Sequence, residues 1–242
     1  IEPPLWLGLI AGYWLKEGET VAIVDAEAEG LSRNETIDRV GSYDPDDVII
    51  VVMGNNPSVS STPKMSIVDD LFVYMNEAWL VGLHPSAVKH KDAVNYNFPI
   101  KDGLPSVPWD MFDLSKYRAH SWHCLDDLEK RSPYAVLYTS LNCPYHCFYC
   151  NVHTLYGDHK VRYRPLEDVY KELDYFAQKG IRNLKIWDEC FTLNHKRVEK
   201  ICDYIIDNDY KFNIWAYARL GQVTPIMLSK MWMAGIKWLA YG

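Results

Sequence analysis

The chain is 242 residues long, and 48% of its residues are apolar, which is enough for one large domain or two modest domains with buried cores. Its formal net charge is −7 and its Lys and Arg residues are scattered, so we expect no nucleic-acid partner. No apolar run approaches the roughly 20 residues that a membrane-spanning helix needs, and no signal peptide is visible. These features predict a cytoplasmic protein without a membrane span.

Helix and strand patterns alternate along the front part of the chain. The predicted helices are residues 4–14, 32–40 and 64–76, and the predicted strands are residues 20–24, 48–53 and 79–83. Such an alternation indicates a parallel sheet with helices on its faces, which binds ligands at the carboxyl ends of its strands. The polar loop 54–63 follows a predicted strand and therefore lies at such an end.

A second alternating series occupies the back part. Between the two series, residues 89–131 lack periodicity but are rich in Pro and aromatic residues, which indicates a linker that packs rather than a flexible one. The predicted strands behind it are residues 135–139, 183–187, 213–218 and 236–241, and the predicted helices are residues 165–179, 194–206 and 224–235. Four successive strand–helix steps indicate part of a barrel. We divide the chain into a front domain (1–95), a linker (96–133) and a back domain (134–242).

Three of the six cysteines, Cys143, Cys147 and Cys150, fall within eight positions after a predicted strand. A disulfide framework spreads its cysteines along the chain, and ordinary buried cysteines rarely cluster, so this spacing points to metal chemistry. Three thiolates on a four-iron, four-sulfur cluster leave one iron open to an outside ligand. The alternative is a zinc site with His146 or His153 as fourth ligand, although the second cysteine pair typical of zinc sites is missing.

The Cys-x3-Cys-x2-Cys loop, with the aromatic Tyr149 before its third cysteine, resembles the radical S-adenosylmethionine (radical SAM) superfamily. The front part resembles the cobalamin-binding subgroup through Pro-Pro-Leu at 3–5, a strand pattern ending at Asp25, Gly-Asn-Asn-Pro at 54–57 and Gly-Leu-His-Pro at 82–85. The resemblance implies an α/β fold: an incomplete Rossmann-like cobalamin-binding domain, followed by the first four βα units of a partial TIM-type radical SAM barrel.

The resemblance also implies roles for single residues. The three cysteines of the loop would bind the 4Fe-4S cluster, and Tyr149 would contact the adenine of SAM. Asp188 and Glu189 would meet the amino group of SAM, and Arg219 would pair with its carboxylate, a planar partner that suits a guanidinium. From the residues alone, helix capping by the two acids and a surface salt bridge of Arg219 are the alternatives.

Cobalamin would lie beside the loop that follows the predicted strand 48–53. Glycine there allows close backbone approach, and the Asn and Ser side chains offer hydrogen bonds to the corrin amides. The residues implied are Gly54, Asn55, Asn56, Ser58, Ser60, Ser61 and Thr62. A plain turn after a buried strand is the alternative. Because no strand precedes the first helix and the second series stops at its fourth strand, we expect the chain to be a fragment of a longer protein.

These features together predict an enzyme that reductively cleaves SAM at a 4Fe-4S cluster. The predicted reaction is cobalamin-dependent methyl transfer to an unactivated carbon or phosphorus. A cobalamin-dependent cyclase or rearrangement enzyme, and a non-catalytic zinc- or cluster-binding module, are the alternatives. The implied partners are a small-molecule substrate and an external one-electron reductant of the flavodoxin or ferredoxin type.

Overall fold

A computed structural model describes residues 1–52, 65–75, 78–82, 104–150, 152, 156 and 158–241 of the chain. Contacts between residues divide the chain into two compact units. The N-terminal unit comprises Pro4–Phe112 and Thr154–Gly157, and the C-terminal unit comprises Ile1–Pro3, Asp113–His153 and Asp158–Gly242. The first three residues therefore belong to the C-terminal unit, although the helix that follows them belongs to the other.

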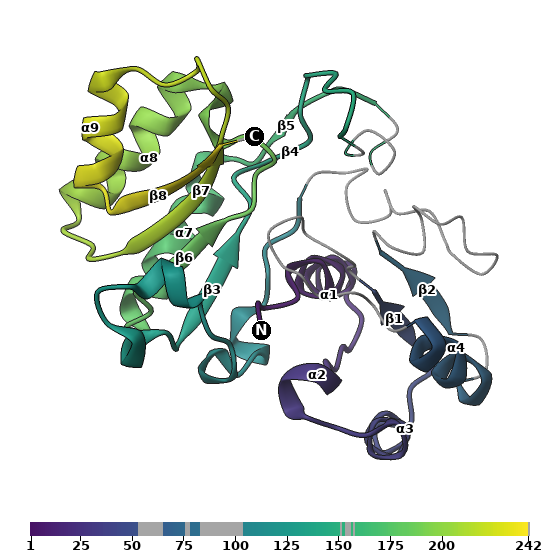
Figure 1. Cartoon of the computed structure of the whole chain (residues 1–242). Coiled ribbons are helices and arrows are strands. Elements are labelled where there is room, and N and C mark those ends of the chain that lie inside the picture. The colour runs from purple at the N-terminus through teal and green to yellow at the C-terminus, as the bar shows by residue number, and fades with distance from the viewer. Residues whose placement is uncertain are drawn as a thin grey trace. The chain divides into compact units, whose positions relative to one another are not determined.

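The N-terminal unit contains helices and two short parallel strands (Figure 1). Its elements are α1 (Leu5–Glu17), α2 (Ala26–Glu29), α3 (Arg33–Gly41), β1 (Ile49–Val51), α4 (Met65–Tyr74), β2 (Trp79–Val81) and the 3-10 turn η1 (Trp109–Met111). Strands β1 and β2 pair in parallel, with Ile49 beside Trp79. The three predicted helices and two of the three predicted strands of this part are therefore confirmed, with ends that differ by a few residues.

The predicted strand at 20–24 is wrong, because these residues pair with no other strand among those that the structure describes. They run as irregular, partly exposed chain from the end of α1 to Asp25. Asp25 accepts a hydrogen bond from the backbone N–H of Ala28 at 3.0 Å and so begins the short helix α2. An apolar run becomes a strand only where a neighbouring backbone pairs with it, and the run itself does not reveal that neighbour.

Helix α1 is buried along its first half and ends at Gly18, which adopts φ 95°. Two glycines inside the helix allow a neighbouring segment to approach closely. A Cβ at Gly12 would lie 2.0 Å from the carbonyl oxygen of Ser106, and one at Gly8 would lie 2.5 Å from Cγ1 of Val107. A side chain at either position would push this segment away from the helix.

Four parallel strands form the sheet of the C-terminal unit, in the order β3-β6-β7-β8 (Figure 1). The strands are β3 (Tyr134–Leu137), β6 (Asn183–Ile186), β7 (Asn213–Ala218) and β8 (Ile236–Tyr241), and the helices between them are α7 (Leu166–Gln178), α8 (His195–Asp207) and α9 (Pro225–Met233). Each strand after the first pairs beside the one before it in this series. The four strands and three helices predicted for this part are confirmed, and the chain is a mixed α/β protein with parallel pairing in both of these sheets.

Two of the three helices of this unit, α8 and α9, begin at residues whose side chains cap them. Asn194 accepts a hydrogen bond from the N–H of Arg197 at 3.1 Å, and Thr224 accepts one from the N–H of Met227 at 3.2 Å. Figure 1 shows α8 and α9 side by side on one face of the sheet. The buried side chains of α8 are Val198, Ile201, Cys202 and Ile205.

An ion pair is buried among aromatic side chains of the C-terminal unit. Lys185 of β6 is fully buried, and its Nζ lies 2.8 and 3.0 Å from the two carboxylate oxygens of Glu2. The same Nζ lies 4.2 Å from the ring centroid of Trp215, and Nε1 of Trp187 donates to Glu2 at 3.1 Å. Burial lowers the pKa of Lys185 to about 8, and the negative charge of Glu2 opposes this shift. No local pattern predicts the pair, because its members are 183 residues apart.

The segment before β3 consists of short 3-10 turns. After η1 they are η2 (Leu114–Lys116), η3 (Ser121–Cys124) and η4 (Leu128–Lys130). The aromatic side chains of Trp109 and Tyr117 are buried. None of the described helices combines the length and apolar character that crossing a bilayer requires, and the longest have 13 residues.

Candidate functional site

The three cysteines of the motif lie on one loop between two short strands, β4 (Ser140–Leu141) and β5 (Arg162–Tyr163). The two strands pair antiparallel, and no sequence pattern predicts them, because two-residue strands show no periodicity. Their pairing brings the two ends of the loop together just after β3. The loop therefore starts and returns at the carboxyl end of a parallel strand, where such sheets bind ligands.

The cysteines of this loop are all free thiols. Cys143 and Cys147 are half-buried and Cys150 is exposed, and burial raises the pKa of Cys143 to about 11. The N–H of Cys150 donates to the carbonyl of Cys147 at 3.0 Å, which closes a tight turn. Among the described residues, no three His, Cys, Asp or Glu side chains are gathered closely enough to hold a single metal ion. Three soft thiolates on one loop do fit the donor set of an iron–sulfur cluster, because each thiolate there binds a different iron.

Asn142, which precedes the first cysteine, anchors the loop and is not among the predicted site residues. Its φ of 72° is left-handed, a conformation that Asn tolerates better than most residues. Its N–H donates to Oε2 of Glu189 at 2.7 Å, and its Oδ1 accepts from the N–H of Cys143 at 2.8 Å. Its Nδ2 donates to Oδ1 of Asp158 at 2.8 Å and to the carbonyl of Lys160 at 3.3 Å. One buried residue thus joins the start of the loop, its return and the predicted acidic segment.

The two predicted acids, which follow β6, have different surroundings. Asp188 is 1% exposed, and its carboxylate accepts from the N–H and hydroxyl of Thr139, both at 2.6 Å, and from the hydroxyl of Ser140 at 2.7 Å. Burial raises the pKa of Asp188, and these hydrogen bonds oppose the shift. Glu189 is only half-buried. Asp188 therefore holds the base of the cysteine loop, and Glu189 lies closer to solvent.

Two arginines complete the set of hydrogen bonds around Thr139. The carbonyl of Thr139 accepts one hydrogen bond from the backbone N–H of Arg164, at 3.0 Å, and one from the guanidinium Nη2 of Arg197, at 2.9 Å. Arg164 is itself buried and forms two hydrogen bonds with the carboxylate of Glu172, at 2.9 and 3.0 Å. With Asp188, the network holds two carboxylates and two guanidinium groups, so its charges balance.

Arg219 follows β7, and the structure places its side chain against the cysteine loop. Its Nη1 lies 3.4 Å from Sγ of Cys147, and its Cζ lies 4.0 Å from the ring centroid of Tyr145. Among the described residues, no carboxylate lies within ion-pair distance of this guanidinium. Arg219 is therefore a cation beside a cysteine of the loop, and its guanidinium is able to bind an anionic group.

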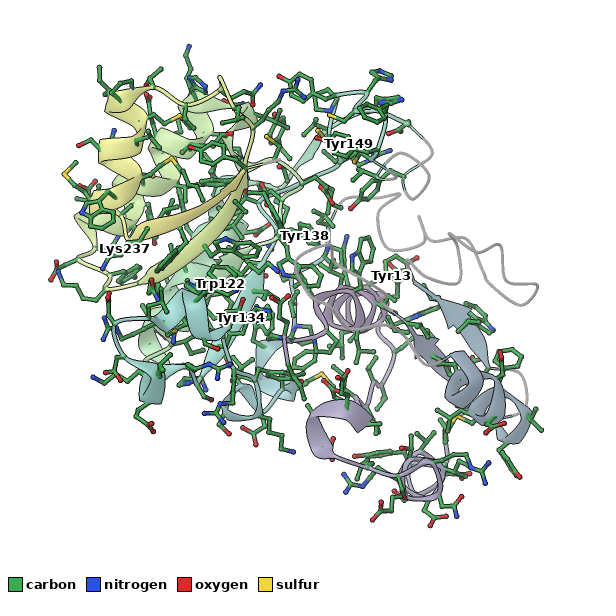
Figure 2. The ribbon with its side chains drawn as sticks, in the orientation of Figure 1. Tyr13, Trp122, Tyr134, Tyr138, Tyr149 and Lys237 are labelled. Atoms are coloured by element: carbon green, nitrogen blue, oxygen red, sulfur yellow. The ribbon has the colours of Figure 1, made fainter. Side chains whose placement is uncertain are left out.

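The aromatic residues between the second and third cysteines face solvent. Tyr149 is 68% exposed and Phe148 is 99% exposed, and their rings meet edge to face at 5.2 Å. Figure 2 shows Tyr149 on the cysteine loop. An exposed ring of this kind is open to stacking by a planar ligand.

Several predicted residues lie outside the described part of the chain. His153, one possible zinc ligand, is among them, whereas the exposed His146 stacks on His159 with ring centroids 3.7 Å apart. All the residues predicted to contact cobalamin also lie outside the described residues: Gly54, Asn55, Asn56, Ser58, Ser60, Ser61 and Thr62.

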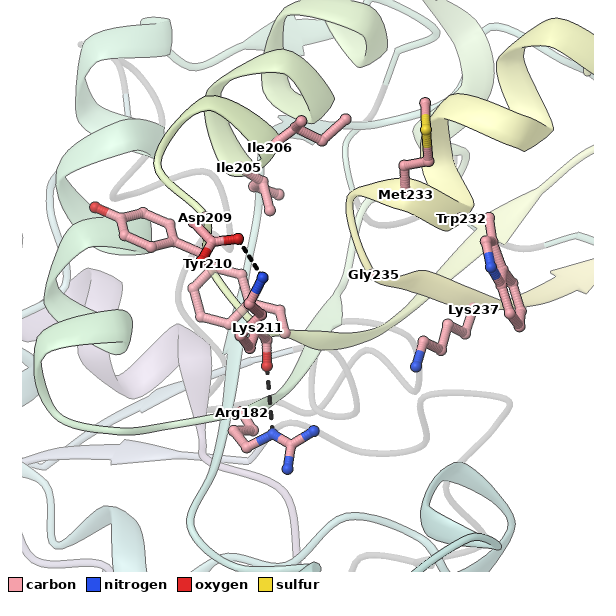
Figure 3. Close-up of a pocket in the computed structure, with 11 residues that line it drawn as sticks. Arg182, Ile205, Ile206, Asp209, Tyr210, Lys211, Trp232, Met233, Gly235 and Lys237 are labelled. Atoms are coloured by element: carbon pink, nitrogen blue, oxygen red, sulfur yellow. Dashed lines mark hydrogen bonds and ion pairs between the residues drawn. The ribbon is translucent and has the colours of Figure 1, made fainter.

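A surface pocket of about 240 Å³ lies at the opposite ends of the strands (Figure 3). Arg182, Lys211 and Gly235, which line it, come just before β6, β7 and β8. Figure 3 shows Asp209 paired with Lys211, and Nε of Arg182 donating to the carbonyl of Lys211 at 3.3 Å. Because parallel sheets bind ligands at the carboxyl ends of their strands, this pocket is not part of the candidate site.

Comparison with known proteins gives a distant methyltransferase relative. No protein-family model matches the chain. The chain is 25% identical to an uncharacterized methyltransferase of Pyrococcus horikoshii, over 81% of this chain and 50% of that protein. The chain thus spans about half the length of this relative.

Solved structures of similar fold include the radical SAM methyltransferase TsrM from Kitasatospora setae. With the structure that contains cobalamin and a 4Fe-4S cluster, the TM-score is 0.74 at 15% identity, over 100% of this chain and 56% of that chain. With the structure that contains tryptophan and the SAM analogue aza-SAM, the TM-score is 0.72 at 15% identity, over 99% and 56%. The resemblance to cobalamin-binding radical SAM proteins is therefore confirmed at the level of the fold.

Proposed function

We propose that this chain carries the cluster- and SAM-binding part of a cobalamin-dependent radical SAM methyltransferase. The observation that carries the proposal is the loop of Cys143, Cys147 and Cys150, with Arg219 3.4 Å from Cys147 and without a carboxylate partner among the described residues. Cysteine thiolates suit an iron–sulfur cluster, and an unpaired guanidinium suits a carboxylate such as that of SAM. The TsrM-like fold and the distant methyltransferase relative support the same reading.

Each residue of the site has a role in this proposal. The three cysteines hold the cluster, which when bound supplies one electron to cleave SAM and an open iron for the methionine end. Arg219 pairs with the SAM carboxylate, Glu189 takes its amino group, and the exposed ring of Tyr149 packs on adenine. Asp188, whose carboxylate is occupied by Thr139 and Ser140, keeps the loop and Glu189 in place.

The cobalamin part of the proposal concerns the loop after β1. Its residues Gly54 to Thr62 provide a small residue for close approach and several amide and hydroxyl groups for the corrin amides. When bound, cobalamin would supply the methyl group for the substrate, and that methyl group would itself come from SAM. Corrin absorbance in protein purified from cobalamin-fed cells tests this part, and its absence would remove cobalamin from the proposal.

Reconstitution tests the chemistry directly. The chain is loaded anaerobically with iron and sulfide, reduced, and examined by electron paramagnetic resonance with and without SAM. A reduced-cluster signal that changes on adding SAM supports the enzyme, whereas a zinc-binding module gives no such signal. Arg219→Ala should weaken SAM binding while leaving the iron content unchanged, and unchanged SAM affinity would rule out the proposed role of Arg219.

Labelled SAM distinguishes methyl transfer from its alternatives. The tryptophan complex of TsrM makes a small-molecule substrate the first choice for screening with methyl-labelled SAM and a reductant of the flavodoxin or ferredoxin type. Methyl transfer to an unactivated carbon or phosphorus predicts label in the product, with both 5'-deoxyadenosine and S-adenosylhomocysteine. Deoxyadenosine without labelled product would favour a cyclase or rearrangement enzyme.

A further inference from the structure

Tyr145 lies between the first two cysteines and contacts the one arginine assigned to SAM. The Cζ of Arg219 lies 4.0 Å from the centroid of its ring, within the distance of a cation–π contact. The hydroxyl of Tyr145 accepts a hydrogen bond from Nε2 of Gln222. Tyr145 is half-buried, so its ring is held by the protein rather than free in solvent.

Gln222 is fixed in turn by the loop that follows β7. Its backbone N–H donates to the carbonyl of Arg219 at 3.2 Å, and its carbonyl lies 2.6 Å from Nε2 of His195, at the start of α8. The contacts of Tyr145 with Gln222 and Arg219 therefore connect the β7–α9 loop, which follows a strand of the large sheet, to the cysteine loop between β4 and β5.

This arrangement restricts the guanidinium in a way that matters for anion binding. An arginine side chain has many rotamers, and its N–H groups donate only near the plane of the guanidinium. The ring of Tyr145, 4.0 Å from Cζ, and the contact of Nη1 with Cys147 together restrict the orientations open to the guanidinium. A guanidinium that is already oriented loses less entropy when a carboxylate binds.

We propose that Tyr145 is a positioning residue that orients the guanidinium of Arg219 for the carboxylate of SAM, with Gln222 holding its ring. The inference rests on the proposed function, because it needs Arg219 to bind SAM. Tyr145 does not touch SAM and acts only through Arg219. Its removal should therefore matter only while Arg219 is present.

A double-mutant cycle on the reconstituted chain tests this, with SAM as the ligand and Kd from calorimetric titration. Tyr145→Leu should raise Kd about threefold to tenfold, the range of a half-buried cation–π contact, with iron content unchanged. In the Arg219→Ala background the same change should have no further effect on Kd. Tyr163→Leu is the matched control, because Tyr163 also lies under an arginine, with Cζ of Arg197 5.4 Å from its ring centroid, and it should leave Kd unchanged.

The outcomes separate the inference from the proposed function. If Arg219→Ala weakens SAM binding but Tyr145→Leu does not, or if the two effects add, the positioning role is overturned and the function stands. If Arg219→Ala binds SAM like the wild type, the role of Arg219 and this inference both fall.

Should Tyr145→Leu fail to hold iron, Tyr145→Phe and Gln222→Met replace it. Gln222→Met should then raise Kd about twofold to threefold, and Tyr145→Phe should do the same, since both release the ring. No rise in either variant would overturn the inference.

Discussion

The carboxylate of Asp188 accepts two hydrogen bonds from Thr139, one from its N–H and one from its hydroxyl, both at 2.6 Å. Asp188 follows β6 and Thr139 follows β3, so the pair joins the carboxyl ends of two neighbouring strands. The carboxylate is almost completely buried, and the bonds form where water does not compete. The buried carboxylate of Asp188 therefore anchors Thr139 and Ser140, the residues that lead into the cysteine loop.

Asp188→Asn should lower the free energy of unfolding by about 2–4 kcal/mol. The amide is neutral, so the three hydrogen bonds lose their charged acceptor, the two hydroxyls must turn to accept from its NH2 group, and Arg197 loses a nearby negative charge. Urea unfolding of the chain measures the loss. Asp207→Asn, at an exposed position in α8, is the control and should stay within about 0.5 kcal/mol of the wild type. Equal losses in both variants would contradict the assigned role of Asp188.

Cys147→Ala should abolish the brown chromophore and reduce bound iron to near background after reconstitution. The reason is that two remaining thiolates of the loop cannot replace the third ligand of the cluster. Cys202→Ala is the matched control, because Cys202 is a buried thiol of α8. It should keep the full iron content and lose about 1 kcal/mol of stability. Full iron in the Cys147 variant would show that the loop is not the cluster site.

Glu2→Gln should lower the free energy of unfolding at pH 7 by about 3–5 kcal/mol, because it leaves the buried ammonium of Lys185 without a counter-charge. Replacing both partners, as Glu2→Gln with Lys185→Met, should recover most of that loss, since an apolar replacement has no charge to desolvate. Urea unfolding of the two variants and the wild type measures the coupling. A double variant as unstable as the single one would contradict the pairing.

Stability should also rise with pH above 8 because of Lys185. Its pKa in the folded chain is lowered from 10.5 to about 8, so between these values the unfolded chain holds a proton that the folded chain has released. The free energy of unfolding should therefore increase with pH over this window, by about 3 kcal/mol at most. The Glu2→Gln, Lys185→Met double variant should lack this rise. The same slope in both proteins would exclude Lys185 as its source.

Acid should destabilise the chain through His123, which is buried in η3. Burial lowers its pKa from 6.5 to about 4, and its Nε2 lies 3.0 Å from the carbonyl of Asn213. Between pH 6.5 and 4 the unfolded chain binds a proton that the folded chain does not, so stability falls as the pH falls, by about 3 kcal/mol in total. His123→Gln keeps a donor but does not titrate, and its unfolding midpoint should change less over this range. Parallel pH profiles would assign the loss to other groups.

The sequence predicts the elements well where the signal is local. The four strands of the large sheet and the helices between them follow from apolar runs, helical periodicity and caps such as Asn194, all carried by residues close together in the chain. The cysteine motif is local in the same sense, since its three thiols fall within eight positions of the chain. The strand predicted at 20–24 is wrong for a related reason. The local pattern suits a strand, but that pattern does not show whether another strand will pair with these residues, and none of the described strands does.

The arrangement of the site was decided by tertiary structure. Asn142, Arg164 and Tyr145 show no pattern as sequence, yet they anchor the loop, brace its base and contact Arg219. Their partners are contributed by other strands and helices, so the hydrogen bonds exist only once the sheet has formed. Sequence alone thus determined that three cysteines lie close together behind the first strand of the large sheet, and it determined the four strands and three helices of that part of the chain. Tertiary structure decided which buried charges hold those elements in place, because long-range pairs leave no trace in local spacing.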